Sequence, residues 1–257
     1  MIHPGLCSLT LGHLPPAEVV GLCAKAGLTH IEWWGKRHVP PGDVDRAREV
    51  SDLTSDAGLA ISTYGSYYRA GVSEGDGLSF DDVFRTALAL GAPAIRVWAG
   101  TKGSETCTEQ GRAAVVADTL RIAKLCAAEG VGLVFEYHAG TLTDTNASAT
   151  AFADEVEHSS VSFGWQVRTG ASVHENLAGL RAMLPRLATM HVFNWSKSPE
   201  GEYVRHPLGE GADEWRGYLE VASEAGRDLV ALLEFVRGDT VVQLEEDARV
   251  LRGLLCG

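Results

Sequence analysis

The chain has 257 residues and a formal net charge of −12, because 34 acidic residues outnumber 22 Lys and Arg. This length suits one large α/β domain. The acidic balance and the lack of any basic run exclude a general nucleic-acid binder, because phosphate neutralisation needs clustered cations. No apolar run approaches the roughly 18 residues that cross a bilayer, so we expect neither a nucleic-acid nor a membrane partner.

The cysteines and the N-terminal residues indicate the compartment. The 5 cysteines are scattered and form no CxxC pair. Free, odd-numbered thiols are typical of a reducing compartment, and the first residues show no signal-peptide pattern. We therefore expect a cytoplasmic protein. The sequence leaves the oligomeric state open, a homodimer included.

Short apolar runs alternate with amphipathic stretches along the whole chain. Strands are predicted at about residues 2–7, 28–34, 59–64, 93–98, 131–137, 161–167, 187–193 and 229–235. Helices are predicted at about residues 16–26, 43–57, 79–90, 109–129, 147–157, 173–183, 212–225 and 240–255. The strand starts recur roughly every 32 residues, which is the size of a βα unit.

Four helix-to-strand junctions share one form, in which a helix ends, a glycine follows and an apolar strand begins. They read AKAGLTHIE, SDAGLAIST, LALGAPAIR and AAEGVGLVF. Glycine suits the left-handed position that ends a helix. Since eight such units close into a barrel with right-handed crossovers, we predict a single-domain (β/α)8 TIM barrel over residues 1–257. The rival, an open doubly wound sheet, usually carries a glycine-rich nucleotide loop after its first strand, and none occurs here.

Polar residues stand at the ends of most predicted strands. In barrels of this kind the active site lies where the strands end and the βα loops begin. Since side chains alternate along a strand, Glu136 and His138 share one face, and the same parity pairs Arg96 with Trp98. The inward direction is favoured, because Glu136 would be costly to bury unpaired among the helices.

Four neighbouring strands then supply Glu136, Gln166, His191 and Glu234 to one pocket. Carboxylate and amide oxygens are hard ligands, and one imidazole among them is compatible with Mn, Mg, Co or Zn. We therefore predict one divalent metal ion at these four residues. The structural alternatives are glutamates paired with arginines, a core histidine, and a glutamine bonded to the backbone.

Further residues around this pocket are candidates for substrate binding. Arg96 either clamps the substrate or forms an ion pair with an acid. Lys197 and Arg205 lie in the long irregular segment 194–211, where they either recognise a substrate anion or are solvated. The predicted substrate-binding residues are Glu32, His38, Arg96, Trp98, Arg168, Lys197 and Arg205.

The repeat pattern, with EYHAGTLTDT, MHVFNW, HPLGEG and LLEF, resembles the xylose-isomerase-like TIM-barrel superfamily, which includes sugar phosphate isomerases/epimerases. The resemblance covers essentially the whole chain, and EYHAGTLTDT is its most specific part. It implies one divalent metal held by Glu136, His191, Glu234 and the strand-six position, and a small polyhydroxylated substrate. It also implies that Glu136 and Glu234 move a proton beside a carbonyl through a metal-stabilised cis-enediolate, which gives isomerisation or epimerisation.

Three positions depart from the ketose epimerases of that superfamily. Gln166 stands where most members have Asp, Thr169 where epimerases have His, and Lys197 where they have Arg. These differences count against a standard free-ketose epimerase. His138, two residues after Glu136, resembles the dehydroshikimate dehydratases, which implies a catalytic role for it. Two alternatives therefore stay open: a dehydratase of a keto-cyclitol or 3-dehydroshikimate-type acid, and a non-catalytic sugar-binding barrel.

Overall fold

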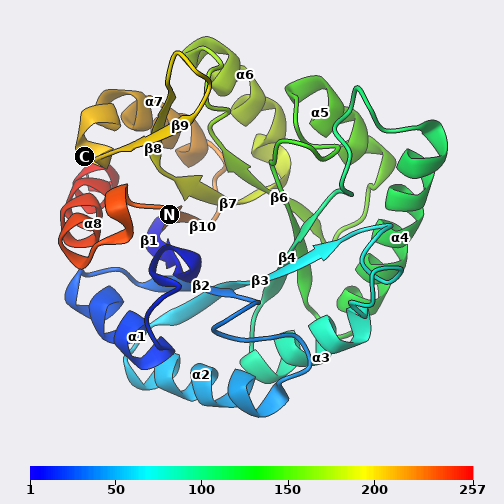
Figure 1. Ribbon diagram of the computed structural model, residues 1–257, viewed down its shortest axis with the longest axis horizontal. Coiled ribbons are helices and arrows are strands. Elements are labelled where there is room, and N and C mark those ends of the chain that lie inside the picture. The colour runs from blue at the N-terminus through cyan, green and yellow to red at the C-terminus, as the bar shows by residue number, and fades with distance from the viewer. Residues whose placement is uncertain (257) are drawn as a thin grey trace.

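Parallel strands close into an eight-stranded barrel inside a ring of helices in the computed structural model, which describes residues 1–256 (Figure 1). The barrel strands are β1 (Ile2–Cys7), β2 (His30–Trp34), β3 (Ala60–Arg69), β4 (Ala94–Trp98), β5 (Gly132–Glu136), β6 (Val161–Gln166), β7 (Leu187–Val192) and β10 (Leu229–Leu233). The surrounding helices are α1 (Pro16–Lys25), α2 (Val44–Asp56), α3 (Phe80–Leu90), α4 (Glu109–Ala128), α5 (Asn146–Glu155), α6 (Val173–Met183), α7 (Ala212–Ser223) and α8 (Val241–Leu255). The predicted TIM barrel is confirmed.

Closure of the barrel depends on its first and last strands. β1 pairs in parallel with β2 on one side and with β10 on the other, where the register runs from Ile2 opposite Leu229 to Leu6 opposite Leu233. The neighbouring order β10-β7-β6-β5-β4-β3-β2 completes the circle. The strands that carry the predicted metal ligands, β5, β6, β7 and β10, are therefore consecutive around the barrel.

The four predicted junction glycines end their helices as expected. Gly27, Gly58, Gly91 and Gly130 have φ values of 70°, 70°, 69° and 71°. A side chain with a Cβ atom adopts this left-handed conformation only at a cost. Each glycine therefore stops its helix and turns the chain back toward the next strand.

Aromatic packing between strands and helices decides which side chains face the barrel axis. Phe135 of β5 packs edge-on against Phe152 of α5, with ring centroids 5.1 Å apart. Trp165 of β6 lies 5.3 Å from the ring of Tyr218 on α7. Because neighbouring residues of a strand point to opposite faces, these outward contacts turn Glu136 toward the axis. Fully burying a Phe side chain contributes about 1.5–3 kcal/mol, so the parity is firmly set.

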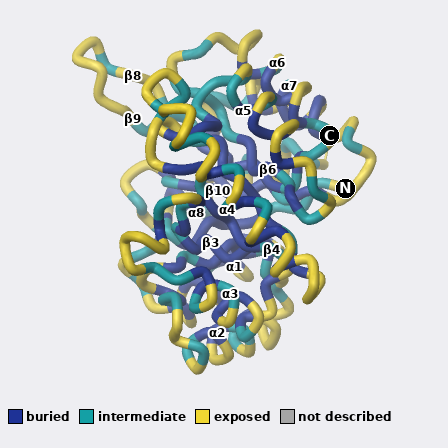
Figure 2. Tube along the Cα trace, turned by 90° about the vertical axis from the view of Figure 1, so that its right-hand side faces the viewer, coloured by how far each residue is buried: buried dark blue, intermediate teal, exposed yellow. Residues whose placement is uncertain are grey.

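Two segments differ from the predicted elements. The segment 194–211, predicted to be irregular, contains an antiparallel hairpin of β8 (Asn194–Lys197) and β9 (Tyr203–His206), and Figure 2 shows it as an exposed projection from the barrel. Its strands are short and lack an alternating apolar pattern, because the hairpin covers little core. Strand β3 runs five residues beyond the predicted end at 64, past a register shift after Gly65, and places Tyr67 near the barrel axis with a φ of 61°.

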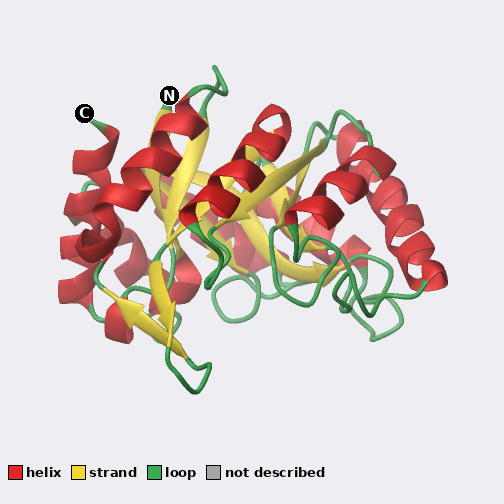
Figure 3. Cartoon of the chain, turned by 90° about the horizontal axis from the view of Figure 1, so that it is seen from above, coloured by secondary structure: helices red, strands yellow, loops and turns green. Residues whose placement is uncertain are grey.

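The two ends of the barrel have different contents. Figure 3 shows the hairpin and most of the long loops on one side and both chain termini on the other. The hairpin side is the carboxyl end of the strands, which is the active-site end of such barrels. No helix in the described part of the chain has the length and apolar character needed to cross a bilayer.

Candidate active site

Glu136 ends strand β5 and is the centre of the buried polar cluster, with 3% of its surface exposed. Its Oε2 atom accepts hydrogen bonds from the Arg96 guanidinium and from the Trp98 indole, both on β4. Its Oε1 atom lies 3.6 Å from Nδ1 of His191 and 3.4 Å from Nε2 of Gln166. One carboxylate oxygen is thus fixed by two donors, and the other is directed toward the β6 and β7 side of the barrel.

Arg96 joins Glu136 to a second buried acid, Glu32. The Nε atom of Arg96 donates to Oε1 of Glu32 at 2.9 Å, and the guanidinium and both carboxylates are almost wholly buried. Glu32 also accepts from Thr63 Oγ1 at 2.5 Å and from Cys7 Sγ at 3.3 Å. Arg96 therefore forms ion pairs with two buried acids, which is one of the two roles predicted for it. Removal of one partner of such a buried pair destabilises a protein by several kcal/mol.

The charges of this cluster shift the pKa values of the two acids downward. Burial acts to raise the pKa of Glu32, but the positive charges of Arg96 and His191 outweigh it and lower that pKa to about 2. For Glu136, burial again opposes the shift, and Arg96 with His191 lowers the pKa further below its ordinary value. Both carboxylates are therefore ionised at neutral pH.

His191, on β7, contacts three acids with its two ring nitrogens. Nδ1 lies 3.4 Å from Oε2 of Glu234 and 3.6 Å from Oε1 of Glu136, while Nε2 lies 3.4 Å from Oε1 of Glu32. Nε2 is buried and completes no hydrogen bond. Burial acts to lower the pKa of His191, but the carboxylates of Glu234 and Glu32 raise it well above the ordinary value.

Glu234 directly follows strand β10, and its pKa is raised, whereas the pKa of Glu136 is lowered. Burial, with the negative charges of Glu136 and Glu32 adding to it, raises the pKa of Glu234 to about 7, although His191 acts against the shift. When two acids share one site, their pKa values commonly move apart in this way, because ionising both places two negative charges close together. Without a further cation, the Glu136, His191 and Glu234 group retains a proton near neutral pH.

The donor set of this cluster fits a divalent metal ion. Ligand atoms of Glu136, His191 and Glu234 lie within 4.8 Å of one another, and all three residues are buried. Two carboxylates and one imidazole suit Mn, Mg, Co or Zn. A second group, Cys7 with Glu32 and His191, has the same spacing. There, however, the Glu32 carboxylate already accepts from Arg96 and Thr63, so the first group is the better cation site.

Gln166 lies beside this cluster with its amide nitrogen toward Glu136. Its Nε2 atom donates to the carbonyl oxygen of Tyr137 and lies 3.4 Å from Oε1 of Glu136. A carbonyl only accepts, so the contact with Tyr137 fixes the orientation of the amide. The predicted contact between the Gln166 oxygen and a metal stays a prediction, because here the amide group acts as a donor to Glu136.

His138 lies above Glu136, as the strand parity predicts. Its ring stacks on the Trp98 indole, with centroids 4.5 Å apart, and its Nδ1 atom lies 2.7 Å from the carbonyl oxygen of Ala139. Because that carbonyl accepts a hydrogen bond from Nδ1–H, Nε2 is the nitrogen left to exchange protons with a substrate.

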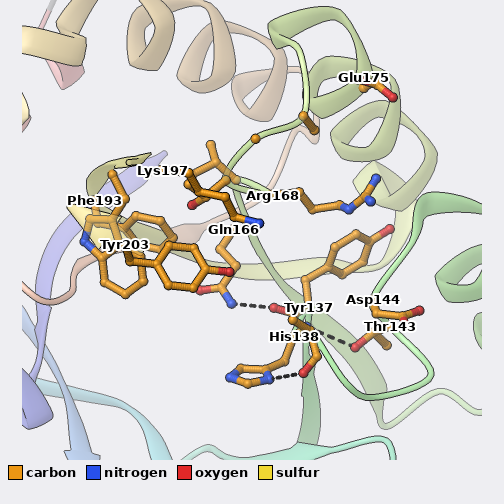
Figure 4. Close-up of a pocket in the computed structure, with 16 residues that line it drawn as sticks. Tyr137, His138, Thr143, Asp144, Gln166, Arg168, Glu175, Phe193, Lys197 and Tyr203 are labelled. Carbon is orange, nitrogen blue, oxygen red and sulfur yellow. Dashed lines mark hydrogen bonds between the residues drawn. The ribbon is translucent and has the colours of Figure 1, made fainter. Parts of the chain in front are cut away.

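Two adjoining cavities open onto this arrangement. The inner chamber has a volume of about 220 Å³ and is lined by Glu136, Glu234 and His138 among others. The outer cavity, of about 660 Å³, is drawn in Figure 4 and contains Arg168 and Lys197. The residues that line both are His138, Gln166, Phe193 and Trp195. The structure thus brings predicted residues on or next to β4, β5, β6 and β10 around these two adjoining cavities.

Three predicted substrate-binding residues lie away from these cavities. Glu32 is fully buried beneath them, and His38 is bonded to Ser8 Oγ at 2.8 Å and to the Leu14 carbonyl at 3.1 Å. Arg205 donates to both carboxylate oxygens of Asp239, at 2.8 and 2.9 Å. Their polar groups have protein partners, and a contact with substrate stays a prediction for all three.

Other residues at the site were not identified from the sequence. Tyr67 and Phe235 line the inner chamber and have positive φ values of 61° and 50°, a conformation that is uncommon for bulky residues and often occurs at functional sites. Cys7 and Thr63 contact Glu32 from neighbouring strands. The position of Cys7 at the end of the first strand was an available signal, whereas no sequence pattern indicates the backbone of Tyr67.

Solved structures with the same fold cover nearly the whole chain. The probable 3-DHS dehydratase AsbF of Bacillus anthracis has 21% identity and a TM-score of 0.78, with 98% of this chain and 99% of that chain covered. A xylose isomerase-like TIM barrel protein from Mycobacterium smegmatis in complex with magnesium has 20% identity, a TM-score of 0.71 and coverages of 96% and 91%. D-allulose 3-epimerase from Methylomonas sp. has 16% identity, a TM-score of 0.73 and coverages of 99% and 97%.

Because all three identities are low, these likenesses show a shared fold and no more. A search of curated proteins found no match. A family model described as xylose isomerase-like TIM barrel matches residues 20–254, which include every barrel strand except β1. The chain therefore belongs to the xylose isomerase-like TIM barrel family.

Proposed function

We propose that this protein is a divalent-metal-dependent isomerase or epimerase of a small polyhydroxylated ketone or aldehyde. The observation that carries the proposal is the pair of buried carboxylates, Glu136 and Glu234, which line one chamber and both face Nδ1 of His191. Two carboxylates from different strands reach a bound substrate from different directions. One can remove a proton next to a carbonyl and the other can return it.

The residues have separate roles in this proposal. Glu136, His191 and Glu234 would hold the metal, which supplies Lewis-acid polarisation of a substrate carbonyl. The Oε2 atom of Glu136 is fixed by Arg96 and Trp98, so its Oε1 atom is the base. Glu234, which lines the same chamber, is the second proton carrier. General acid and base groups of this kind contribute about 10²- to 10⁴-fold in rate.

A dehydratase is the second candidate, and His138 is the observation that favours it. Its ring is held by stacking on Trp98 and by the Ala139 carbonyl, and it lines both cavities. A positioned histidine in its imidazolium form can give its Nε2 proton to a departing β-hydroxyl, which leaves as water, after Glu136 has removed the α-proton. The probable 3-DHS dehydratase of similar fold supports this candidate by analogy of fold alone.

One experiment separates the two reactions and tests the first proposal. Protein purified without chelator is analysed for metal and then incubated with ketoses, keto-cyclitols and 3-dehydroshikimate in deuterated water. Isomerisation or epimerisation incorporates deuterium beside the carbonyl without a new ultraviolet band, whereas dehydration produces a conjugated chromophore. No deuterium exchange and no chromophore with any of these compounds would favour a non-catalytic sugar-binding barrel.

A further inference from the structure

The outer cavity carries cations that the proposed chemistry does not use. Arg168 and Lys197 both line it, and neither forms an ion pair with any acid in the described residues 1–256. The Lys197 ammonium lies 5.4 Å from the ring centre of Tyr203, and its stem passes over Gly170. Figure 4 shows the Lys197 side chain among the residues that line this cavity.

The two acids of the same cavity, by contrast, each have one oxygen bonded to the protein. The Oδ2 atom of Asp144 accepts from the backbone N–H of Ser104 at 2.9 Å. The Oε2 atom of Glu175 accepts from the backbone N–H and the hydroxyl of Ser172, at 2.9 and 2.8 Å, as part of a helix cap. These bonds hold the two carboxylates to the wall, whereas Arg168 and Lys197 have no acid partner to give up on binding a ligand.

Some residues that line this cavity also carry a buried polar atom without a hydrogen-bond partner. Of the seven such side-chain atoms among the described residues, three belong to residues that line it: Tyr137 OH, Asp144 Oδ1 and Trp195 Nε1. Tyr137 is only 2% exposed, and Figure 4 shows its phenol and the Arg168 side chain extending toward the same part of the cavity. A buried polar atom without a partner costs about 1–3 kcal/mol.

The size of the inner chamber gives an independent reason to use the outer one. Pockets for small ligands have volumes of about 300–1,000 Å³, and the inner chamber has about 220 Å³. A substrate longer than the reacting carbons therefore extends past His138 and Gln166, which line both spaces. Its distal end then lies between Lys197, Arg168 and Tyr137.

We propose that the outer cavity binds an anionic group of a polyhydroxylated substrate, a carboxylate or a phosphate, through Arg168 and Lys197, with the Tyr137 hydroxyl as an added donor. This inference rests on the proposed function, because it places the reacting carbons beside Glu136 and Glu234. It narrows the substrate class to hydroxylated acids and sugar phosphates and disfavours neutral sugars.

Calorimetric titration of the full chain tests the proposal, with and without Mn²⁺. The probes are D-fructose, D-fructose 6-phosphate and 3-dehydroshikimate. We expect at least one anionic probe to bind about 10- to 100-fold more tightly than D-fructose, which is the range of a charged hydrogen bond. A preference confined to the phosphate or to the carboxylate identifies which anion the cavity takes.

Substitutions then locate the effect. Arg168→Gln and Lys197→Gln should each reduce the preference for the anionic probe to less than about 3-fold, and Tyr137→Phe should reduce it partly, as charged and neutral hydrogen bonds differ in strength. Arg181→Gln, which removes the same charge from an exposed position on α6, should leave it unchanged. Equal binding of all probes, no binding of either anionic probe, or an unchanged preference in both cation variants would overturn the proposal.

The same titrations separate this inference from the proposed function. Glu136→Gln and Glu234→Gln remove the proposed proton carriers but leave Arg168 and Lys197 in place. If these variants lose turnover and keep the anion preference, both proposals stand. If they keep turnover, the proposed chemistry is wrong while the anion site remains.

Discussion

The Nε2 atom of His191 lies 3.4 Å from Oε1 of Glu32, on the side of the ring opposite to Glu136 and Glu234. A carboxylate in this position favours a proton on Nε2 and leaves the Nδ1 lone pair directed at the two other acids. Partners of this kind commonly fix the tautomer of a metal-binding histidine. We therefore expect Glu32, which is fully buried, to act by positioning His191.

Substitution of Glu32 tests this positioning role. Glu32→Ala should weaken Mn²⁺ binding about 10- to 100-fold, and Glu32→Gln, which keeps an acceptor oxygen, should weaken it less. Calorimetric titration of metal-free protein measures both affinities. Thr63→Val, which removes only the hydroxyl that donates to Glu32, is the matched control and should retain nearly normal affinity. Equal affinities in the Ala variant and the unchanged protein would contradict the role.

Replacement of the two chamber carboxylates should abolish turnover. Glu136→Gln and Glu234→Gln each remove a proton carrier and a negative ligand, so less than a tenth of the activity should remain, a change of more than about 1.4 kcal/mol in the barrier. Circular dichroism should show an intact barrel, since each amide can still occupy the same space. Activity above that level in either variant would remove its residue from the chemistry.

His138→Ala should lower kcat by about 10² or more, because a positioned imidazole contributes at least this much to proton transfer. Metal affinity should be unchanged, because the His138 ring stacks on Trp98 and its Nδ1 atom is hydrogen-bonded to the Ala139 carbonyl oxygen. Steady-state kinetics and a Mn²⁺ titration of the same preparation check the two halves of the prediction. Loss of metal together with activity would instead make His138 a ligand.

Gln166→Asp should tighten metal binding without raising kcat. The substitution adds a negative charge beside Glu136 and removes the amide donor to the Tyr137 carbonyl. Coulomb attraction for a divalent ion therefore increases, while the metal-free protein loses a hydrogen bond and should melt at a lower temperature. Gln166→Asn, which shortens the side chain without adding charge, separates the two effects. If the Asp and Asn variants bind Mn²⁺ equally, charge at position 166 does not act on the metal.

Metal binding should release protons near neutral pH. Burial raises the pKa of Glu234 to about 7, and the surrounding carboxylates raise that of His191, so the metal must displace protons that the cluster holds. Affinity for Mn²⁺ should consequently rise between pH 6 and 8. Titrations in two buffers of different ionisation enthalpy measure the released protons. Identical heats in both buffers would show that none are released.

The same shift predicts how the stability of the metal-free protein depends on pH. The pKa of Glu234 in the fold lies above its ordinary value of 4.5, so its contribution to stability is complete below pH 4.5 and is lost as the pH rises through about 7. The lowered pKa values of Glu32 and Glu136 change the stability only below about pH 4.5, which is their ordinary pKa. The melting temperature of metal-free protein should fall between pH 5 and 7.5, and Glu234→Gln should remove much of the fall. A flat profile would contradict the shift at Glu234.

The barrel strands could be predicted from the sequence because each is a short apolar run between a helix-ending glycine and a polar loop. The same alternation correctly placed Glu136 and His138 on one side of β5. The alternation does not show how far along the barrel axis each side chain lies. For that reason Glu32 was expected at the pocket wall, whereas it is fully buried beneath it. The β8–β9 hairpin was missed since Trp195 and Tyr203 contact each other at the rim and not a core face.

The orientation of side-chain polar groups was the least predictable part of the site. The sequence places an amide at position 166, but only the Tyr137 carbonyl decides that its nitrogen faces Glu136. Likewise, a salt bridge between residues 64 positions apart, such as Arg96 with Glu32, depends on barrel closure. The positive φ of Tyr67 follows a register shift in β3 that no local pattern announces.

The pairing of β1 with β10 has a consequence for biosynthesis. The first strand leaves the ribosome early, yet its partner spans Leu229–Leu233, so one edge of the growing sheet stays unpaired until nearly the whole chain has been translated. Glu234 directly follows that last strand and faces His191 only once the strand has docked. The proposed cation site of Glu136, His191 and Glu234 would therefore be complete only after β10 has docked, and a nascent chain that lacks β10 would lack one of its three ligands.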